Sequence, residues 1–281
     1  MFIGNPHIKE YFGKLIKSDA LSHAYLFHGP EGVGKKLFAL ELSGLIVGPY
    51  AASDLKVIDK KNEEIHIADI RELKDFINLT PFGKQKVVII NNSHNLGRDA
   101  SNALLKVLEE PPGKSVIFLI SHFQKMLLPT LTSRCQAWRF RPFKKNEILD
   151  YLNRDPEGVP PRAGPYGARE KINKERAYLI AKMAGGSLGL AVKLSDNFNN
   201  FQKNANLLNK LARADYKERF DTVKKISADS DELKKTVEDW FVYSASLSSK
   251  RVAREILYLN NILSKSQFNH RLALENFLAK L

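Results

Sequence analysis

The sequence predicts a parallel α/β domain followed by an all-helical segment. Three observations support this fold class. A glycine-rich loop near the N-terminus joins a short apolar run to a run with helical spacing. Two further runs rich in β-branched residues flank a predicted helix, and this alternation is typical of a parallel sheet. Beyond the middle of the chain only helical patterns remain.

The glycine-rich loop GPEGVGKK runs from Gly29 to Lys36. The apolar run AYLF before it predicts a strand, and the spacing over 37–46 predicts a helix after it. A phosphate-binding loop needs this order, because its amides and the helix N-terminus point at the phosphates. The usual pattern is G-x-x-x-x-G-K followed by Ser or Thr. Gly29, Gly34 and Lys35 match it, whereas Lys36 replaces the hydroxyl, so we predict a P-loop fold with an altered last position.

The next two strands are predicted from continuous apolar runs. VVIINN at 87–92 and SVIFLIS at 115–121 have the pattern of strands that are buried on both faces of a parallel sheet. Between them, the segment RDASNALLKVLEEPPG predicts a helix that ends at Pro111 and Pro112, since proline cannot continue a helix.

After RFRPF, at 139–143, the strand-like runs stop. KKNEILDYLN predicts one helix, and the Pro- and Gly-rich segment 154–169 predicts an exposed loop, to which we assign no function. The segment 174–195 predicts two helices around a Gly185-Gly186 break, and residues 197–281 are predicted to be helical throughout.

These changes divide the chain into three predicted domains. They are an α/β domain at 1–142, a small helical domain at 143–195 and a larger helical domain at 196–281. In the last domain, apolar residues recur at i, i+3, i+4 and i+7. This pattern primarily indicates a buried core, and a surface for a partner is the secondary interpretation. The predicted core positions are Leu207, Leu208, Leu211, Leu233, Val237, Trp240, Phe241, Ile256, Leu259, Ile262 and Leu263.

Composition limits the possible partners and compartments. The net charge of +13 favours nucleic acid, an anionic membrane or an acidic protein, although a solubilising surface charge explains it equally well. The single cysteine, Cys135, excludes an internal disulfide and a multi-cysteine zinc site, and we expect it to be a small packing residue. The start of the sequence does not resemble a secretory signal, and the apolar runs are too short to span a bilayer. We therefore expect a soluble cytoplasmic protein without membrane contact.

ATP hydrolysis by a P-loop protein needs three groups of residues. Loop amides and a lysine hold the phosphates, a hydroxyl after that lysine binds Mg²⁺, and an acid at the end of a second strand holds the metal. Gly32 and Lys35 supply the first group. Lys36 has no hydroxyl, and Asn91 and Asn92 stand where the acids belong. An amide cannot act as a base and is a weak Mg²⁺ ligand, so the sequence predicts a degenerate nucleotide site without a metal.

Four stretches of the sequence together resemble one protein family. They are SHAYLFHGPEGVGKK, SNALLKVLEEPP, LPTLTSRC and NHRLALENFLAKL. In this order they resemble the delta-prime family of bacterial DNA polymerase III clamp-loader subunits, which lies within the AAA+ clamp-loader group. The resemblance covers most of the chain and implies an AAA+ sheet domain, a small helical lid and a helical collar that packs into a five-subunit ring.

The resemblance also implies roles for individual residues. Such a subunit does not hydrolyse ATP, and the arginine of its SRC motif, here Arg134, reaches the ATP site of a neighbouring motor subunit. Ser121 stands at the family's nucleotide-sensing position, although it could simply cap the strand. Gly189 stands where a second sensing arginine is often found. Many members carry a four-cysteine zinc module that this chain lacks.

The implied partners are gamma/tau-type motor subunits, a delta-type subunit, the sliding clamp and primed DNA, in a hetero-oligomer of the DNA polymerase III holoenzyme. Two alternatives to the non-hydrolysing subunit remain open. The chain could be a working AAA+ ATPase, either a motor clamp-loader subunit or a branch-migration helicase. It could also be a scaffold that holds ATP or ADP without turnover, because the loop amides and Lys35 are retained.

Overall fold

A computed structural model describes residues 4–60, 63–111, 113–153, 172–245, 247, 249–265 and 268–281. They form two compact units. The first comprises the chain up to Lys144 together with Gly186–Gly189, and the second comprises Lys145–Gly185 and Leu190–Leu281. The predicted segment 154–169 lies outside the described residues. The predicted lid and collar both belong mainly to the second unit, and the boundary between them at 195 stays a prediction.

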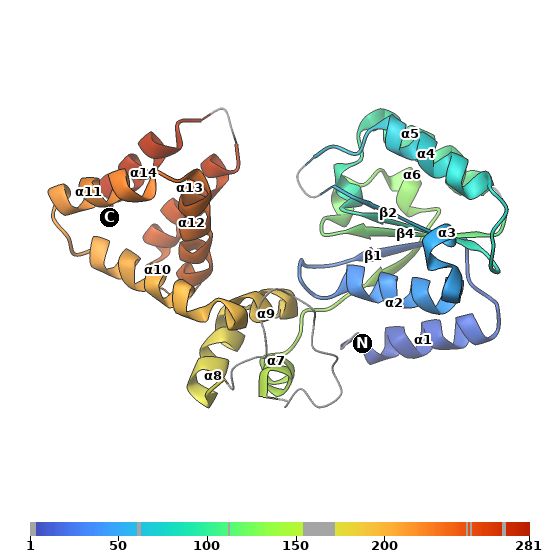
Figure 1. The fold of residues 1–281 in the computed structure, drawn as a ribbon, viewed down its shortest axis with the longest axis horizontal. Helices are drawn as coiled ribbons and strands as arrows, with labels where there is room; N and C mark the ends of the chain where they lie inside the picture. Colours follow the sequence, from blue (N-terminus) through green and yellow to red (C-terminus); the bar gives the residue numbers. More distant parts are fainter. Residues whose placement is uncertain are drawn as a thin grey trace. The chain divides into compact units, whose positions relative to one another are not determined.

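Within the described residues, the first unit holds one sheet of five parallel strands in the order β2-β3-β4-β1-β5 (Figure 1). This confirms the predicted parallel α/β fold. The strand bounds are Ala24–His28 for β1, Leu55–Asp59 for β2, Lys86–Asn91 for β3, Ser115–Ser121 for β4 and Gln136–Arg139 for β5. Because all five strands run the same way, their carboxyl ends meet at one edge, where ligands bind in open α/β sheets.

Helices cover both faces of this sheet (Figure 1). α1 and α2 lie on one face, and α4 and α5 lie on the other. The principal helices of the unit are α1 (Pro6–Lys17), α2 (Lys35–Val47), α4 (Ile67–Asn78) and α5 (Arg98–Glu109). Shorter turns complete it, namely η1 (Gly48–Tyr50), α3 (Ala51–Asp54), η2 (Ser93–Asn95), η3 (Gln124–Met126) and α6 (Pro129–Thr132).

The two faces of the sheet have different side chains because neighbouring residues of a strand point to opposite faces. On β1, Ala24 and Leu26 join an aliphatic core with α4 and α5. The alternate residues Tyr25 and Phe27 join an aromatic cluster with α1 and α2, in which the ring of Phe12 lies 4.8 Å from Tyr25 and 5.5 Å from Phe27. The position of α2, and therefore of the glycine loop before it, is fixed by this aromatic layer.

The strands β2 and β5 were not expected from the sequence. They lie at the two ends of the strand order, so each has only one neighbour in the sheet. Val57 of β2 is 39% exposed, and β5 is largely exposed. Only the central strands are buried on both faces and read as continuous apolar runs, as β3 and β4 do. Edge strands carry polar residues and therefore give a weaker signal.

A buried ion pair ties β3 to the segment before β2. Lys86 is 2% exposed and donates to Asp54, which is fully buried, at 2.9 Å, and to the carbonyl of Ser53 at 2.9 Å. Asp54 also accepts from the amides of Phe82 and Gly83. Burial alone would raise the pKa of Asp54, but these hydrogen bonds and the Lys86 charge outweigh it, so the pKa lies below its ordinary value.

The second unit is helical, as predicted. The helices that lie wholly or mainly in it are α7 (Lys145–Asn153), α8 (Lys174–Met183), α9 (Leu188–Asp196), α10 (Phe198–Leu211), α11 (Tyr216–Ile226), α12 (Ser230–Ser244), α13 (Lys250–Leu263) and α14 (His270–Ala279). The gap between α8 and α9 contains the predicted break at Gly185-Gly186. No helix among the described residues is long and apolar enough to cross a membrane.

Trp240 lies at the centre of the core formed by α10 to α14. It is fully buried, and its indole N–H donates to the carbonyl of Asn204 at 2.8 Å. All of the predicted core positions except Phe241 and Ile262 belong to this core or pack against it, and the prediction was wrong for Phe241, which is 40% exposed. Successive residues of a helix are turned by about 100°, so Phe241 leaves the face that Trp240 occupies.

The Lys86–Asp54 pair gives a test of stability. We expect Lys86→Met to lower the free energy of unfolding by about 3–5 kcal/mol, because it leaves the buried Asp54 carboxylate without its cation. Lys56→Met is the control, since Lys56 pairs with Glu72, whose side chain is 72% exposed, and such a surface pair contributes about 0–1 kcal/mol. Urea denaturation measures the free energy of unfolding of both variants. Equal destabilisation by Lys86→Met and Lys56→Met would contradict the buried ion pair.

Candidate phosphate-loop site

The loop that follows β1 has the backbone of a phosphate-binding loop. Gly29, Gly32 and Gly34 all have positive φ, and Gly34 is the N-cap of α2. A Cβ at Gly29 would overlap the backbone carbonyl of Phe140, so only glycine fits at this strand end. The predicted order of strand, loop and helix N-terminus is therefore present.

Lys35, the lysine of the motif, turns back onto its own loop. Its ammonium donates to the carbonyls of Gly29 at 2.6 Å and Pro30 at 2.5 Å. The residue is 3% exposed, and burial lowers the pKa of its ammonium to about 8. In this conformation the charge that would reach a phosphate is held by the carbonyls of the loop itself.

Lys36 connects the loop to the ends of β2 and β3. Its ammonium forms an ion pair of 2.5 Å with one carboxylate oxygen of Asp59. The other oxygen of Asp59 accepts from the side-chain amide of Asn91 at 2.7 Å and, more weakly, from that of Asn92 at 3.4 Å. We call Lys36, Asp59, Asn91 and Asn92 the Asp59 corner. Three predicted site residues thus converge on one acid.

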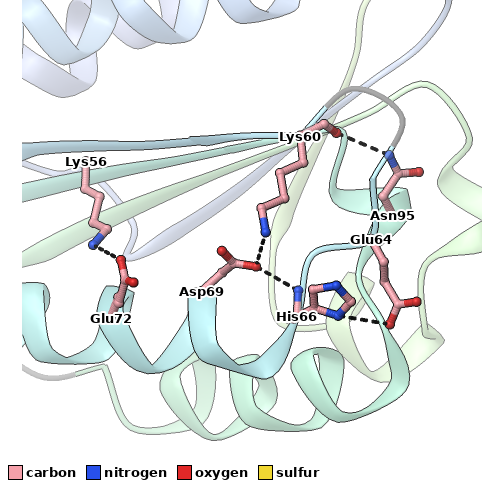
Figure 2. Close-up of polar contacts among 7 residues, drawn as sticks. All are labelled: Lys56, Lys60, Glu64, His66, Asp69, Glu72 and Asn95. Carbon is pink, nitrogen blue, oxygen red and sulfur yellow. Dashed lines mark hydrogen bonds and ion pairs between the residues drawn. The ribbon is translucent and has the colours of Figure 1, made fainter.

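The position of Asp59 is set by the sheet and by the residue after it. Asp59 is the last residue of β2 and lies opposite Asn91 in the parallel pairing with β3. The carbonyl of Lys60 accepts from the Asn95 side chain at 3.3 Å, and the Lys60 ammonium pairs with Asp69 of α4 at 2.8 Å (Figure 2). These contacts hold the end of β2 on both sides, so the Asp59 carboxylate has a fixed place.

Polar residues at the end of β4 complete this edge of the sheet. The hydroxyl of Ser121 is buried, accepts from the amide of Phe123 at 3.1 Å, and lies 3.5 Å from Nδ1 of His94. Ser121 therefore caps the turn after the strand. Burial and then the nearby Lys35 charge lower the pKa of His94, and the same causes lower that of His122 to about 4. Both imidazoles are neutral near pH 7.

Gly189 lies directly against the loop. It belongs to Gly186–Gly189, the segment that is part of the first unit. Its amide donates to the carbonyl of Gly32 at 2.8 Å, and a Cβ at Gly189 would lie only 3.2 Å from the Cα of Gly32. A glycine at this position thus allows two backbones to touch where a side chain would force them apart.

Arg134 lies outside this group, in the turn between α6 and β5. Its guanidinium pairs with Glu109, the last residue of α5, at 2.6 Å and donates to the carbonyl of Thr130 at 3.0 Å. The side chain is 36% exposed. The neighbouring Cys135 packs against the aliphatic core, and burial raises the pKa of its thiol to about 12, as expected for a packing residue.

Comparisons with known proteins identify relatives of this chain. A family model described as "DNA polymerase III, delta subunit" matches residues 47–144. The chain is 35% identical over 136 residues to the DNA polymerase III subunit delta' of Pseudomonas aeruginosa, which covers 41% of this chain and 42% of that protein. It is 31% identical over 222 residues to the subunit gamma/tau of Mycoplasma genitalium, covering 71% and 35% respectively.

This chain belongs to the DNA polymerase III clamp-loader family. It is also 29% identical over 211 residues to the subunit delta' of Bacillus subtilis, covering 68% of this chain and 59% of that protein. This clamp-loader chain therefore spans between 35% and 59% of the length of these three relatives.

Solved structures place the clamp-loader chain in the AAA+ fold. A gamma subunit-related DNA polymerase III protein of Thermotoga maritima matches 96% of this chain and 97% of its own, with a TM-score of 0.62 and 23% identity. The RuvB Holliday junction branch migration motor of the same organism matches 98% of this chain and 82% of its own, with a TM-score of 0.56 and 14% identity. At these identities the likeness concerns the fold alone.

Asp59 is the residue of this site that the sequence did not reveal. It ends the stretch LKVID, a short run with a single acid. The strand before it lacks the continuous apolar run and the paired acids that usually mark such a position, because β2 is an edge strand with a mixed pattern. An acid at the end of a strand-like run, facing a lysine in the glycine loop, is the signal that could have found it.

The P-loop fold implies Mg²⁺ bound with a nucleotide, but the Asp59 corner does not fit that ion. Mg²⁺ takes oxygen ligands in near-octahedral geometry. Lys36 and Asn91 direct N–H donors at Asp59 instead of offering oxygens to a cation. Among the described residues, no group of three His, Cys, Asp or Glu side chains is placed to hold a metal ion.

The lowered pKa of Lys35 predicts a pH dependence of stability. Between about pH 8 and 10.5 the unfolded chain binds a proton at Lys35 that the folded chain does not, so the contribution of Lys35 to stability rises with pH. Relative to Lys35→Met, wild type should gain about 2 kcal/mol from pH 7.5 to 10. Urea denaturation at both pH values measures this gain. Lys14→Met, at an exposed lysine, is the control. If the stability difference between wild type and Lys35→Met did not change with pH, the lowered pKa of a buried Lys35 ammonium would be contradicted.

Proposed function

We propose that this chain is a non-hydrolysing, delta-prime-like subunit of a DNA polymerase III clamp loader. In this role it sits in a ring with gamma/tau-type and delta-type subunits and helps to load a sliding clamp onto primed DNA. The observation that carries the proposal is the Asp59 corner, in which Lys36 and Asn91 face a carboxylate where a hydrolysing site needs oxygen ligands for a metal.

The chemistry of phosphoryl transfer explains why this observation supports a lack of turnover. The γ-phosphoryl group moves through a transition state whose charge must be neutralised by a metal, a lysine and often an arginine. In this chain Lys35 is engaged by loop carbonyls, and Lys36 occupies the position of the metal-binding hydroxyl. Neither Asn91 nor Asn92 can hold Mg²⁺ as a carboxylate does or activate a water.

Arg134 supports a role in trans. A planar, permanently charged guanidinium suits a γ-phosphate, and this one is partly exposed rather than directed at the loop of its own chain. Glu109 and the Thr130 carbonyl take up donors of the guanidinium and fix its plane. A partner's phosphate would replace or share the Glu109 contact when the ring assembles.

A second candidate is a scaffold that binds a nucleotide without turnover. The positive φ values of Gly32 and Gly34 favour it, because the loop keeps the backbone that cradles phosphates. Equilibrium binding of a labelled nucleotide to the isolated chain, with and without Mg²⁺, separates this candidate from a subunit that holds none.

The isolated chain should release phosphate from ATP at a negligible rate, because nothing in the corner holds the metal that neutralises the β and γ oxygens. A steady-state phosphate-release assay checks this, with Lys35→Ala as the control for contaminating activity. Turnover of about one per second, in the usual range for kinases, that disappears in Lys35→Ala would contradict the proposal.

Arg134→Ala should leave the fold intact and lower the ATPase rate of the assembled loader. A trans arginine can contribute roughly 10³-fold or more at the site it faces, and the loss over a whole ring is partial, because other sites keep their own arginines. Arg134→Lys should fail nearly as badly, since lysine lacks the planar fork.

The measurement is reconstitution with partner subunits, clamp and primed DNA. Lys14→Ala, which removes a surface cation paired with Glu10 in the same helix, is the matched control and should behave as wild type. A ring with Arg134→Ala that hydrolyses ATP and loads the clamp at the wild-type rate would show that Arg134 does not act at the ATP site of a neighbouring subunit.

A further inference from the structure

The Asp59 corner has the opposite polarity to a metal site. In a P-loop that binds Mg²⁺, the hydroxyl after the motif lysine and a carboxylate after the second strand direct oxygens at a cation. Here an ammonium and an amide from the same two positions, Lys36 and Asn91, direct N–H donors at the carboxylate of Asp59. The central ion of the corner is an anion, and it belongs to the protein.

We propose that the Lys36 ammonium is a built-in cation that closes this corner to divalent metal ions. Both carboxylate oxygens of Asp59 are engaged, one by Lys36 and the other by Asn91. A divalent ion entering here would meet a positive charge within hydrogen-bond reach of Asp59, and like charges at that range repel. Lys36 is therefore the specificity-determining residue of the corner.

The surrounding structure makes Lys36 the part of the corner whose replacement disturbs the rest least. Asp59 is held by its pairing with β3, and the next residue, Lys60, is held by Asn95 and Asp69 (Figure 2). Asn91 ends a fully buried strand. The Lys36 side chain, in contrast, is 44% exposed, so its replacement costs little packing.

The inference concerns the same corner as the proposed function but does not depend on a ring or on Arg134. It predicts that removing the ammonium, and not merely adding an acid, opens the corner to a metal. Asn91→Asp with Lys36 retained adds a second carboxylate that the ammonium can also neutralise. Lys36→Thr with Asn91→Asp restores a hydroxyl and a carboxylate, next to Asp59, and leaves three oxygen-bearing side chains without a cation.

The experiment compares wild type, Asn91→Asp, Lys36→Thr/Asn91→Asp and Lys36→Arg/Asn91→Asp in the full isolated chain. Circular dichroism confirms folding, electron paramagnetic resonance measures Mn²⁺ binding with and without ADP, and thermal melting is followed with Mn²⁺ or EDTA. Only Lys36→Thr/Asn91→Asp should bind Mn²⁺ tighter than wild type, by about tenfold or more, equivalent to about 1.4 kcal/mol. Only its melting temperature should rise with Mn²⁺.

Two results would overturn the inference. The first is a folded Lys36→Thr/Asn91→Asp chain that binds Mn²⁺ no tighter than wild type. The second is equal Mn²⁺ binding by Asn91→Asp or by Lys36→Arg/Asn91→Asp, because the positive charge would then not be what excludes the ion. Neither result bears on Arg134 in the assembled ring, so the proposed function can stand or fall separately.

Discussion

The carboxylate of Asp59 needs compensating charge and hydrogen bonds, and the arrangement of the candidate site follows from this need. A partly buried acid at the end of a strand is stable when donors reach both of its oxygens. Lys36 comes from the start of α2, and Asn91 comes from the end of β3. The glycine loop and the two strand ends are thus joined through one side chain, and the loop has a charged anchor that is part of the protein itself.

The aromatic layer and the parallel sheet are what bring these groups together. Phe38 of α2 packs against Phe12, Phe27 and Phe140, so the first turns of α2 are fixed relative to β1 and α1. The parallel register then places Asp59 opposite Asn91. Because packing of large rings is stiff, the start of α2 has a fixed position from which the Lys36 ammonium reaches Asp59.

The sequence predicted the parts of the fold that repeat a strong pattern. β1, β3 and β4, the helices α2 and α5, and the loop glycines were all predictable, because central strands and loop backbones demand particular residue types. β2 and β5 were not, since edge strands tolerate polar residues, and Asp59 was missed with β2. The contact of Arg134 with Glu109 joins the end of α5 to the turn after α6, and no pattern in one sequence reports such a pairing.

The proposed loss of hydrolysis and the proposed role of Arg134 in a neighbouring site are consistent with each other in physical terms. Lys35 already places one cation on the loop carbonyls and Lys36 holds a second beside the loop on Asp59, so a third cation directed at the loop would be repelled. Arg134 is instead paired with Glu109 at an accessible turn. An ion pair between arginine and glutamate at an exposed site contributes little free energy, so the arginine can leave it. A phosphate carries more negative charge than the Glu109 carboxylate and is therefore the stronger partner for the guanidinium. Under the proposed function, the same electrostatics that would stop hydrolysis in this chain would let Arg134 exchange Glu109 for the phosphate of a neighbouring subunit.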